Sequence, residues 1–185
     1  LFSAVNITTG LLAAFALADE QGADALSMRR VADALGVGTM SLYNHVAGKD
    51  DLLDGLRDLV LETIDLPAAS GDWKAEIRAC ELSTHRALWR HPWVCGLWRG
   101  RTATPMSLAY AEARLACLRR SGFAAEDAYA MYHVLDNFTP GYTQQQLSFM
   151  TTFPGWRQGE MEQVATDLLA TLSPETHPYM VEHVR

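Results

Sequence analysis

Apolar residues recur at every third or fourth position along most of this chain, and no segment of useful length alternates in the manner of a β-strand. In residues 6–20, for example, Leu11, Phe15 and Ala18 fall on one face of a helix. Helices with such faces bury them against other helices. The sequence therefore predicts an all-α fold.

Capping residues, glycines and prolines divide this pattern into separate helices. We expect helices over residues 6–20, 28–35, 39–46, 50–64, 73–90, 105–120, 125–147 and 160–172, with a short segment over 93–99. Ser27, Asp72 and the pair Thr104-Pro105 are typical of helix starts. Pro140 is expected to kink the long helix. The small, polar stretch at residues 67–72 is the clearest domain boundary, and residues 151–156 are expected to form a loop.

Composition limits the compartment and the groups that the chain could bind. The 185 residues are 49% hydrophobic, which is enough for one or two domains, and no apolar run is long enough to cross a membrane. The cysteines Cys80, Cys95 and Cys117 are odd in number and lack a CxxC spacing, which argues against a disulfide framework or a structural zinc site. We expect a cytoplasmic protein with no cofactor, no metal and no membrane contact.

Charge is distributed unevenly along the chain. The net charge of −7 is unfavourable for binding nucleic acid, and residues 1–60 hold four basic against eight acidic residues, a balance of −4. Between Met28 and Lys49, however, three basic residues face a single acid, Asp33. A local DNA-binding surface is therefore compatible with the acidic whole.

Two short helical segments, residues 28–35 and 39–46, are separated only by Gly-Val-Gly. Such a pair joined by a tight glycine turn is typical of a helix-turn-helix, whose second helix enters the major groove of DNA. Leu42 and Val46 lie four residues apart and would face inward. The outward positions would then be Thr39, Met40, Ser41, Tyr43, Asn44 and His45.

These outward residues have the chemistry that DNA contacts require. Hydroxyls and the N–H groups at a helix start bind phosphate, asparagine pairs with the edge of adenine, and a side-chain methyl contacts thymine. Lys49 follows the second helix, where a phosphate is within reach, and Arg29 begins the first helix, where it would reach a guanine or a phosphate. The alternative is an ordinary helical hairpin with solvated polar residues, which the density of the motif makes less favourable.

The segment ALSMRRVADALGVGTMSLYNHVAGKDDLL strongly resembles the N-terminal domain of the TetR family of transcriptional repressors. The family pattern is a supporting helix, LGV, a recognition helix with LY-x-H, and K-x-x-LL, and the match covers about residues 6–64. RRSGFAAEDAYAMYHVLDNFTPGY resembles the tetracycline-repressor subgroup more loosely. The resemblance implies an all-α homodimer with a helix-turn-helix domain (residues 1–48), a connecting helix (49–66) and a ligand-binding and dimerisation domain (72–185).

Position by position, the resemblance assigns roles to the residues named above. Tyr43 and Lys49 match phosphate contacts, and Arg29 matches a base-contacting arginine. Thr39, Met40, Ser41, Asn44 and His45 match residues that face the groove. The chain departs from the family in having no basic residues before the first helix. The histidine pair that binds magnesium–tetracycline in that subgroup is replaced by Asp65 and Trp98, so neither tetracycline nor magnesium is expected.

The C-terminal part is rich in aromatic residues that are core candidates one by one but that together favour an aromatic ligand cavity. The aromatic residues in question are Trp89, Trp93, Trp98, Tyr110, Tyr129, Tyr132 and Phe138. Polar groups for the cavity would come from Thr84, Arg114, His133, Asp136 and Asn137. The predicted ligand-binding residues are Thr84, Trp89, Trp98, Arg114, Tyr129, Tyr132, His133 and Asn137.

Other functions have weaker support in the sequence. The spacing of His85, His91 and Cys95 does not place all three on one helical face, so a metal site is disfavoured. Cys95 or Cys117 with His133 would suggest an enzyme, but no nucleophile motif is present. We therefore expect a regulator and not an enzyme: a homodimeric repressor that binds double-stranded operator DNA and is released by a small effector. An activator, and a ligand-binding or protein-interaction module of the same fold that has lost specific DNA binding, remain as alternatives.

Overall fold

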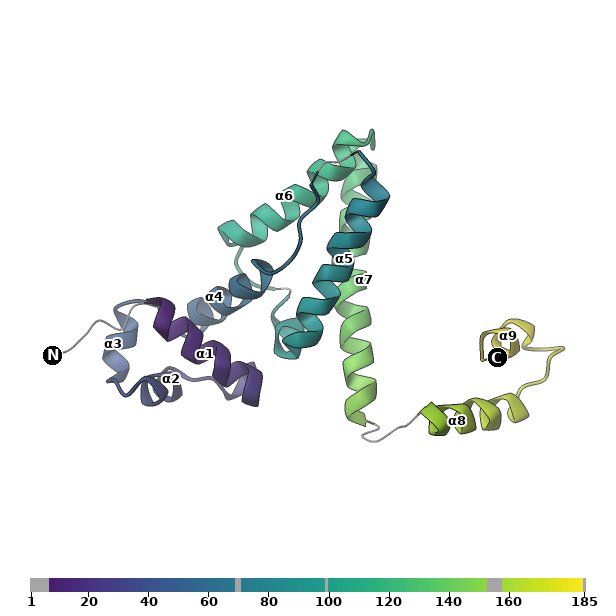
Figure 1. Ribbon diagram of the computed structural model, residues 1–185, viewed down its shortest axis with the longest axis horizontal. Coiled ribbons are helices and arrows are strands. Elements are labelled where there is room, and N and C mark those ends of the chain that lie inside the picture. The colour runs from purple at the N-terminus through teal and green to yellow at the C-terminus, as the bar shows by residue number, and fades with distance from the viewer. Residues whose placement is uncertain (1–6, 69–70, 99, 153–157, 185) are drawn as a thin grey trace. The chain divides into compact units, whose positions relative to one another are not determined.

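The computed structural model describes residues 7–68, 71–98, 100–152 and 158–184, and every regular element in these ranges is a helix (Figure 1). The all-α prediction is therefore confirmed. The α-helices are α1 (Ile7–Gln21), α2 (Met28–Leu35), α3 (Thr39–Tyr43), α4 (Lys49–Leu61), α5 (Trp73–Arg90), α6 (Pro105–Arg120), α7 (Ala125–Thr152), α8 (Gln158–Thr171) and α9 (Pro178–Val184). Two 3₁₀ segments, η1 (Ala23–Ala25) and η2 (Pro92–Leu97), lie between them.

The predicted helix starts are confirmed by their caps. The Ser27 hydroxyl accepts a hydrogen bond from the Arg30 amide at 3.2 Å, and the Asp72 carboxylate accepts one from Ala75 at 3.1 Å. Thr104 and Ser107 form a reciprocal capping box at the start of α6. Each cap satisfies an amide that the helix itself leaves unpaired.

Some helix bounds differ from the expected ones. The third helix ends at Tyr43, since the amides of His45 and Val46 both donate to the Leu42 carbonyl in a closing turn. α7 runs through Pro140 to Thr152, so the first two residues of the expected loop are helical, while residues 153–157 lie outside the described part. By its internal contacts the chain divides into residues 1–145 and 146–185.

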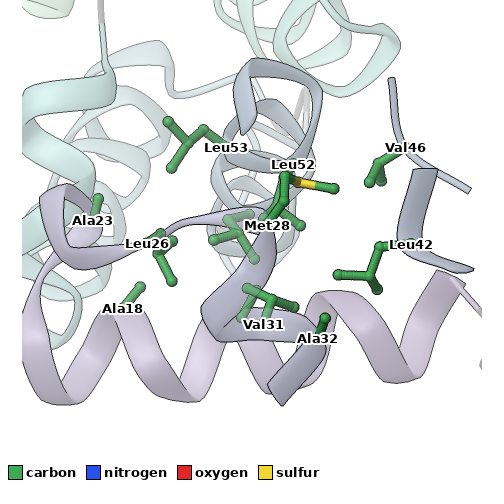
Figure 2. Packing of buried hydrophobic residues seen from close by; sticks show 12 residues of the cluster. Ala18, Ala23, Leu26, Met28, Val31, Ala32, Leu42, Val46, Leu52 and Leu53 are labelled. Atoms are coloured by element: carbon green, nitrogen blue, oxygen red, sulfur yellow. The ribbon is translucent and has the colours of Figure 1, made fainter. Parts of the chain in front are cut away.

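The N-terminal core is an apolar cluster built by α1, η1, α2, α3 and the first half of α4 (Figure 2). Leu42 and Val46, the residues predicted to face inward, are 4% and 9% exposed. Val31 and Ala32 from α2 are fully buried beside them. α3 is therefore held on the protein by its buried side while its other side is left free.

A second core begins where the first one ends. α4 contributes Leu52, Leu53 and Leu56 to the N-terminal core, and Val60 and Leu61 to a cluster that also contains residues of α5, η2 and α6. A single uninterrupted helix thus takes part in both cores. A rigid-body displacement of α4 would therefore change the packing in both hydrophobic cores.

Candidate DNA-binding surface and ligand pocket

The candidate DNA-binding surface consists of α3, the turn after it, and the nearby basic residues. Met40 is 76% exposed and Tyr43 is 47% exposed, unusual values for large apolar side chains. Asn44 and His45 are also exposed, whereas Thr39 and Ser41 are half-buried. The predicted contact residues therefore include four that are open to a partner and two at the edge of the protein surface.

The basic residues near α3 differ in how much they are engaged by the protein. Arg30 is occupied, because it donates to the Ala25 carbonyl at 2.8 Å and to the Gln21 side chain. The Arg29 side chain is 86% exposed, and its only described ion pair is a 3.9 Å contact with Asp33. Exposed pairs of this kind contribute little to stability, so Arg29 can exchange Asp33 for another partner.

Lys49 occupies the first position of α4. Its ammonium lies 3.4 Å from the carbonyl oxygen of Asp24, a long and weak hydrogen bond. A phosphate would be a stronger acceptor than this carbonyl, because charge-assisted hydrogen bonds are the stronger class. The Lys49 ammonium is therefore available to contact a phosphate of the DNA backbone.

A contact that the sequence did not reveal connects α1 to η2. One carboxylate oxygen of Asp19 lies 2.7 Å from Nδ1 of His91 and accepts a hydrogen bond from the Trp93 indole N–H, also at 2.7 Å. Phe15 packs edge-on against both rings, with centroid distances of 4.8 and 5.4 Å. An acidic residue in the last turn of a helix opposes the helix dipole, and this was the available signal that Asp19 has another role.

The candidate ligand pocket is a hollow of about 90 Å³ between α4, α6, α7 and the segment after η2. Its lining residues are Arg57, Leu61, Trp98, Ser107, Tyr110, Tyr132 and Asp136. The Trp98 and Tyr110 rings meet edge to face at 5.8 Å, and the Trp98 N–H donates to Asp136 at 3.2 Å. The walls are thus aromatic, with charged groups at a few points, as is common for small-ligand sites.

Behind this pocket lies a buried charge, Arg114. Its guanidinium carbon lies 4.8 Å from the centre of the Tyr110 ring and 5.2 Å from that of Tyr132. Its terminal nitrogens approach Glu81 at 2.7 Å and Asp136 at 3.5 Å. Thr84 shares a 3.0 Å hydrogen bond with the Tyr110 hydroxyl. The structure therefore brings together four of the predicted ligand-binding residues: Thr84, Trp98, Arg114 and Tyr132.

Of these four residues, Trp98 and Tyr132 line the pocket, and the remaining four predicted ligand-binding residues lie away from it. They are Trp89, Tyr129, His133 and Asn137, and all four are exposed. The Asn137 side chain donates to the His133 carbonyl at 2.6 Å, and the Tyr129 ring packs on His133 at 4.3 Å. A part for them in ligand binding remains a prediction without support from this geometry.

Sequence reasoning missed the pocket residues that α4 supplies. Arg57 and Leu61 both line the pocket, and the Arg57 side chain is only 5% exposed. Its Nη2 donates to the Thr102 carbonyl at 3.0 Å and to the Thr104 hydroxyl at 3.4 Å. The signal was present, because Arg57 lies four residues after Leu53 and so falls on the buried stripe of α4.

Cys80 and Cys117 are buried in the core, and Cys95 is half-buried. Burial, reinforced by the neighbouring Glu81, raises the pKa of the Cys80 thiol to about 12. Burial is also the main cause that raises the pKa of Cys95 and of Cys117. Thiols that stay protonated are poor nucleophiles.

The histidines considered for a metal site are engaged elsewhere, His91 with Asp19 and His85 with the Thr143 hydroxyl at 2.7 Å. No group of three potential metal ligands is found among the described residues. In the same part of the chain, no helix is both long and apolar enough to span a membrane.

Comparison with known proteins identifies both halves of the chain. Residues 11–56 match the family model "Bacterial regulatory proteins, tetR family", and residues 66–184 match "Tetracyclin repressor-like, C-terminal domain". The repressor DrrR1 of Streptomyces coeruleorubidus is 36% identical over 138 residues, covering 73% of this chain and 51% of that protein. The class A tetracycline repressor of transposon 1721 from Escherichia coli is 31% identical over 169 residues, covering 90% of this chain and 75% of that repressor.

Solved structures agree with the sequence matches. Apo ActR from Streptomyces coelicolor superposes with a TM-score of 0.83 at 26% identity, over all of this chain and 85% of ActR. With several curated relatives the match spans only about half of their length, 51% for DrrR1 and 56% for a regulator of Saccharopolyspora erythraea. The family models together cover most of the residues, and the chain belongs to the TetR family of bacterial regulatory proteins.

Proposed function

We propose that this chain is a homodimeric transcriptional repressor that leaves its operator when a small aromatic ligand fills the pocket. The observation that carries the proposal is the position of α4. Its first half is part of the N-terminal core that holds α3, while Arg57 and Leu61 from its second half line the pocket. A ligand that changes the position of α4 therefore has a direct route to the DNA-binding surface.

The relatives support this proposal. DrrR1 is named a transcriptional repressor. ActR has been solved in complex with actinorhodin, and a TetR variant from Acinetobacter baumannii in complex with minocycline, each at 26% identity to this chain. By analogy, residues 1–48 would form the DNA-binding domain, and residues 72–185 would form the domain that binds the ligand and dimerises. Residues 49–66 would be the helix that connects these two domains.

DNA recognition would follow from the surface of α3. In a dimer, two copies of α3 would enter successive major grooves of a pseudo-palindromic site. Tyr43 and Lys49 would contact phosphates, and Arg29 would reach a base edge. The remaining groove-facing residues would be Thr39, Met40, Ser41, Asn44 and His45. Release needs only that the ligand bind more tightly to a conformation in which the two copies of α3 no longer fit this spacing.

The first test is binding to the intergenic DNA beside the chain's own gene, titrated with salt. We expect sequence-dependent binding. The logarithm of the binding constant should fall linearly with the logarithm of the salt concentration, because phosphate contacts release counterions. Tyr43→Phe and Lys49→Ala should weaken binding to all sequences alike. Arg29→Ala should reduce discrimination at one base pair by about 1–3 kcal/mol.

Arg78→Ala is the matched control, because Arg78 is an exposed cation on α5 and should leave the salt dependence unchanged. Equal weakening of every sequence by Arg29→Ala would refute its base-reading role. Absence of specific binding by a folded dimer would instead indicate a module that has kept the fold and lost the DNA.

The ligand half of the proposal is tested with Trp98→Ala. Trp98 lines the pocket and donates to Asp136, yet it lies outside α3 and its turn. The variant should bind operator DNA as the unaltered chain does, but polycyclic aromatic compounds that release the unaltered chain should fail to release it. Release of both proteins at the same compound concentration would exclude Trp98 from the ligand site.

A further inference from the structure

Two side chains from residues 91–97 converge on a single carboxylate oxygen of α1. Oδ1 of Asp19 lies 2.7 Å from Nδ1 of His91 and 2.7 Å from Nε1 of Trp93. An ionised carboxylate only accepts hydrogen bonds, so both ring nitrogens must carry a hydrogen, and this fixes the orientation of the imidazole. Hydrogen bonds to a charged acceptor are the stronger class. Asp19 therefore holds both rings firmly against the end of α1.

The aromatic rings around this carboxylate lie where the two cores meet. Phe15 and Trp93 each pack against the N-terminal core and against the second core. Phe15 also contacts the His91 ring edge-on. The side chains of His91 and Asp19 are 20% and 35% exposed, so water and salt screen their interaction only in part. The contact is thus built into the packing between the two cores.

No other side chain of α1 makes such a link in the described part of the chain. Gln21 is hydrogen-bonded to Arg30, which follows it in the same N-terminal segment. Glu20 is exposed and has no hydrogen bond or ion pair with any described residue. Asp19 is therefore the point at which α1 is attached by side-chain hydrogen bonds to the later part of the chain.

η2 leads directly from this contact to the candidate ligand pocket. It spans the 6 residues Pro92–Leu97, and Trp98 follows it at once. The Trp98 amide donates to the Cys95 carbonyl, while the Trp98 ring lines the pocket. A short 3₁₀ segment closed by i→i+3 hydrogen bonds has little slack. A displacement of Trp98 would therefore be transmitted through η2 to Trp93 and to Asp19.

We propose that Asp19 is a positioning residue, which fixes the orientation of the N-terminal core, and with it α3, by holding His91 and Trp93. This inference rests on the proposed function, because orientation matters only if two copies of α3 must match the spacing of an operator. It gives the pocket a second route to α3, through η2 and α1, beside the route through α4. With the contact broken, α3 would keep its own structure but lose its fixed orientation.

The functional test measures how sharply the full chain discriminates the spacing between operator half-sites. The probes are the operator fragment from the intergenic DNA and two derivatives, with one and two base pairs inserted at its centre. Each insertion rotates and shifts one half-site, so two rigidly held copies of α3 lose affinity. Asp19→Ala should lower the spacing selectivity, which is the affinity ratio of the original to the longest fragment, roughly tenfold.

Glu20→Ala is the matched control, because it removes the neighbouring exposed carboxylate from the same helix. It should keep the spacing selectivity of the unaltered chain. Asp19→Asn retains the shape and an uncharged acceptor, so its selectivity should lie between those of Asp19→Ala and the unaltered chain. Equal weakening of all three fragments by Asp19→Ala would show a merely structural role and would overturn the proposal, as would unchanged selectivity.

A double variant tests whether Asp19 acts through Trp93. Trp93→Phe keeps an aromatic ring against Phe15 but removes the N–H donor. Because both substitutions break one contact, the double variant Asp19→Ala with Trp93→Phe should lose no more selectivity than Asp19→Ala alone. Losses that simply add would mean that the two residues act separately, which would overturn the proposed route.

A distance measurement without DNA separates this inference from the proposed function. Nitroxide labels are placed through a keto amino acid at Met40 on α3 and Arg78 on α5, both exposed, and the labelled protein is diluted with unlabelled chain. Pulsed electron resonance should give a narrow distance distribution for the unaltered chain and for Glu20→Ala, and a broader one for Asp19→Ala. Equal widths together with specific operator binding would overturn the positioning role and leave the regulator intact. A broader distribution in a chain that binds no operator would support the positioning role and overturn the regulator.

Discussion

Replacing Arg114 with methionine is expected to lower the free energy of unfolding by about 3–5 kcal/mol, because breaking a buried ion pair leaves uncompensated charge. The Arg114 side chain is fully buried and approaches Glu81 at 2.7 Å and Asp136 at 3.5 Å. Methionine preserves much of the length and the apolar contact with the two tyrosine rings, but it leaves two carboxylates without their partner. Urea unfolding followed by circular dichroism measures the change.

Two further variants make this result interpretable. Arg78→Met, on the exposed side of α5, should leave stability within about 0.5 kcal/mol of the unaltered chain. Adding Glu81→Gln to Arg114→Met should recover part of the loss, since it removes one of the orphaned charges. If Arg114→Met proved as stable as the Arg78 control, the charge network would contribute nothing to folding.

The local features of the fold could be predicted from the sequence because their causes are local. Ser27, Asp72 and Thr104 cap the helices that they were expected to cap, since each acts on an amide three residues ahead. The inward orientation of Leu42 and Val46 follows from their spacing. The early end of α3 is also local, because the amides of His45 and Val46 both donate to the Leu42 carbonyl. Apolar periodicity does not show such a closing turn.

The candidate pocket was predictable only in part, because its polar contacts join distant residues. Arg57 bonds to residues 45 and 47 positions later, and Asp19 contacts His91, which lies 72 positions later. Periodicity places Arg57 on a buried stripe but says nothing of what it meets there. For the same reason, aromatic content alone did not separate Trp98 and Tyr132, which line the pocket, from Trp89 and Tyr129, which are exposed.

Leu42→Ala is expected to destabilise the N-terminal core by about 2–5 kcal/mol and to abolish specific operator binding. α3 has five residues and no side-chain cap at its start, and Leu42 is its buried residue. Leu42 packs in the same cluster as Met28 and Val31 (Figure 2). It also lies close to Gly10. Without this anchor, a helix of little more than one turn has no intrinsic stability to hold its shape. Thermal unfolding and operator affinity, measured on one preparation, report both effects.

Met40→Ala is the matched control for this prediction, because it makes a similar change two residues away on the same helix. Met40 is 76% exposed, so its removal should leave the unfolding free energy unchanged and alter operator affinity only at the base pairs that it contacts. If Leu42→Ala left operator affinity unchanged, α3 would not be the helix that reads the DNA. Removing the side chain that anchors α3 would then have had no effect on DNA binding.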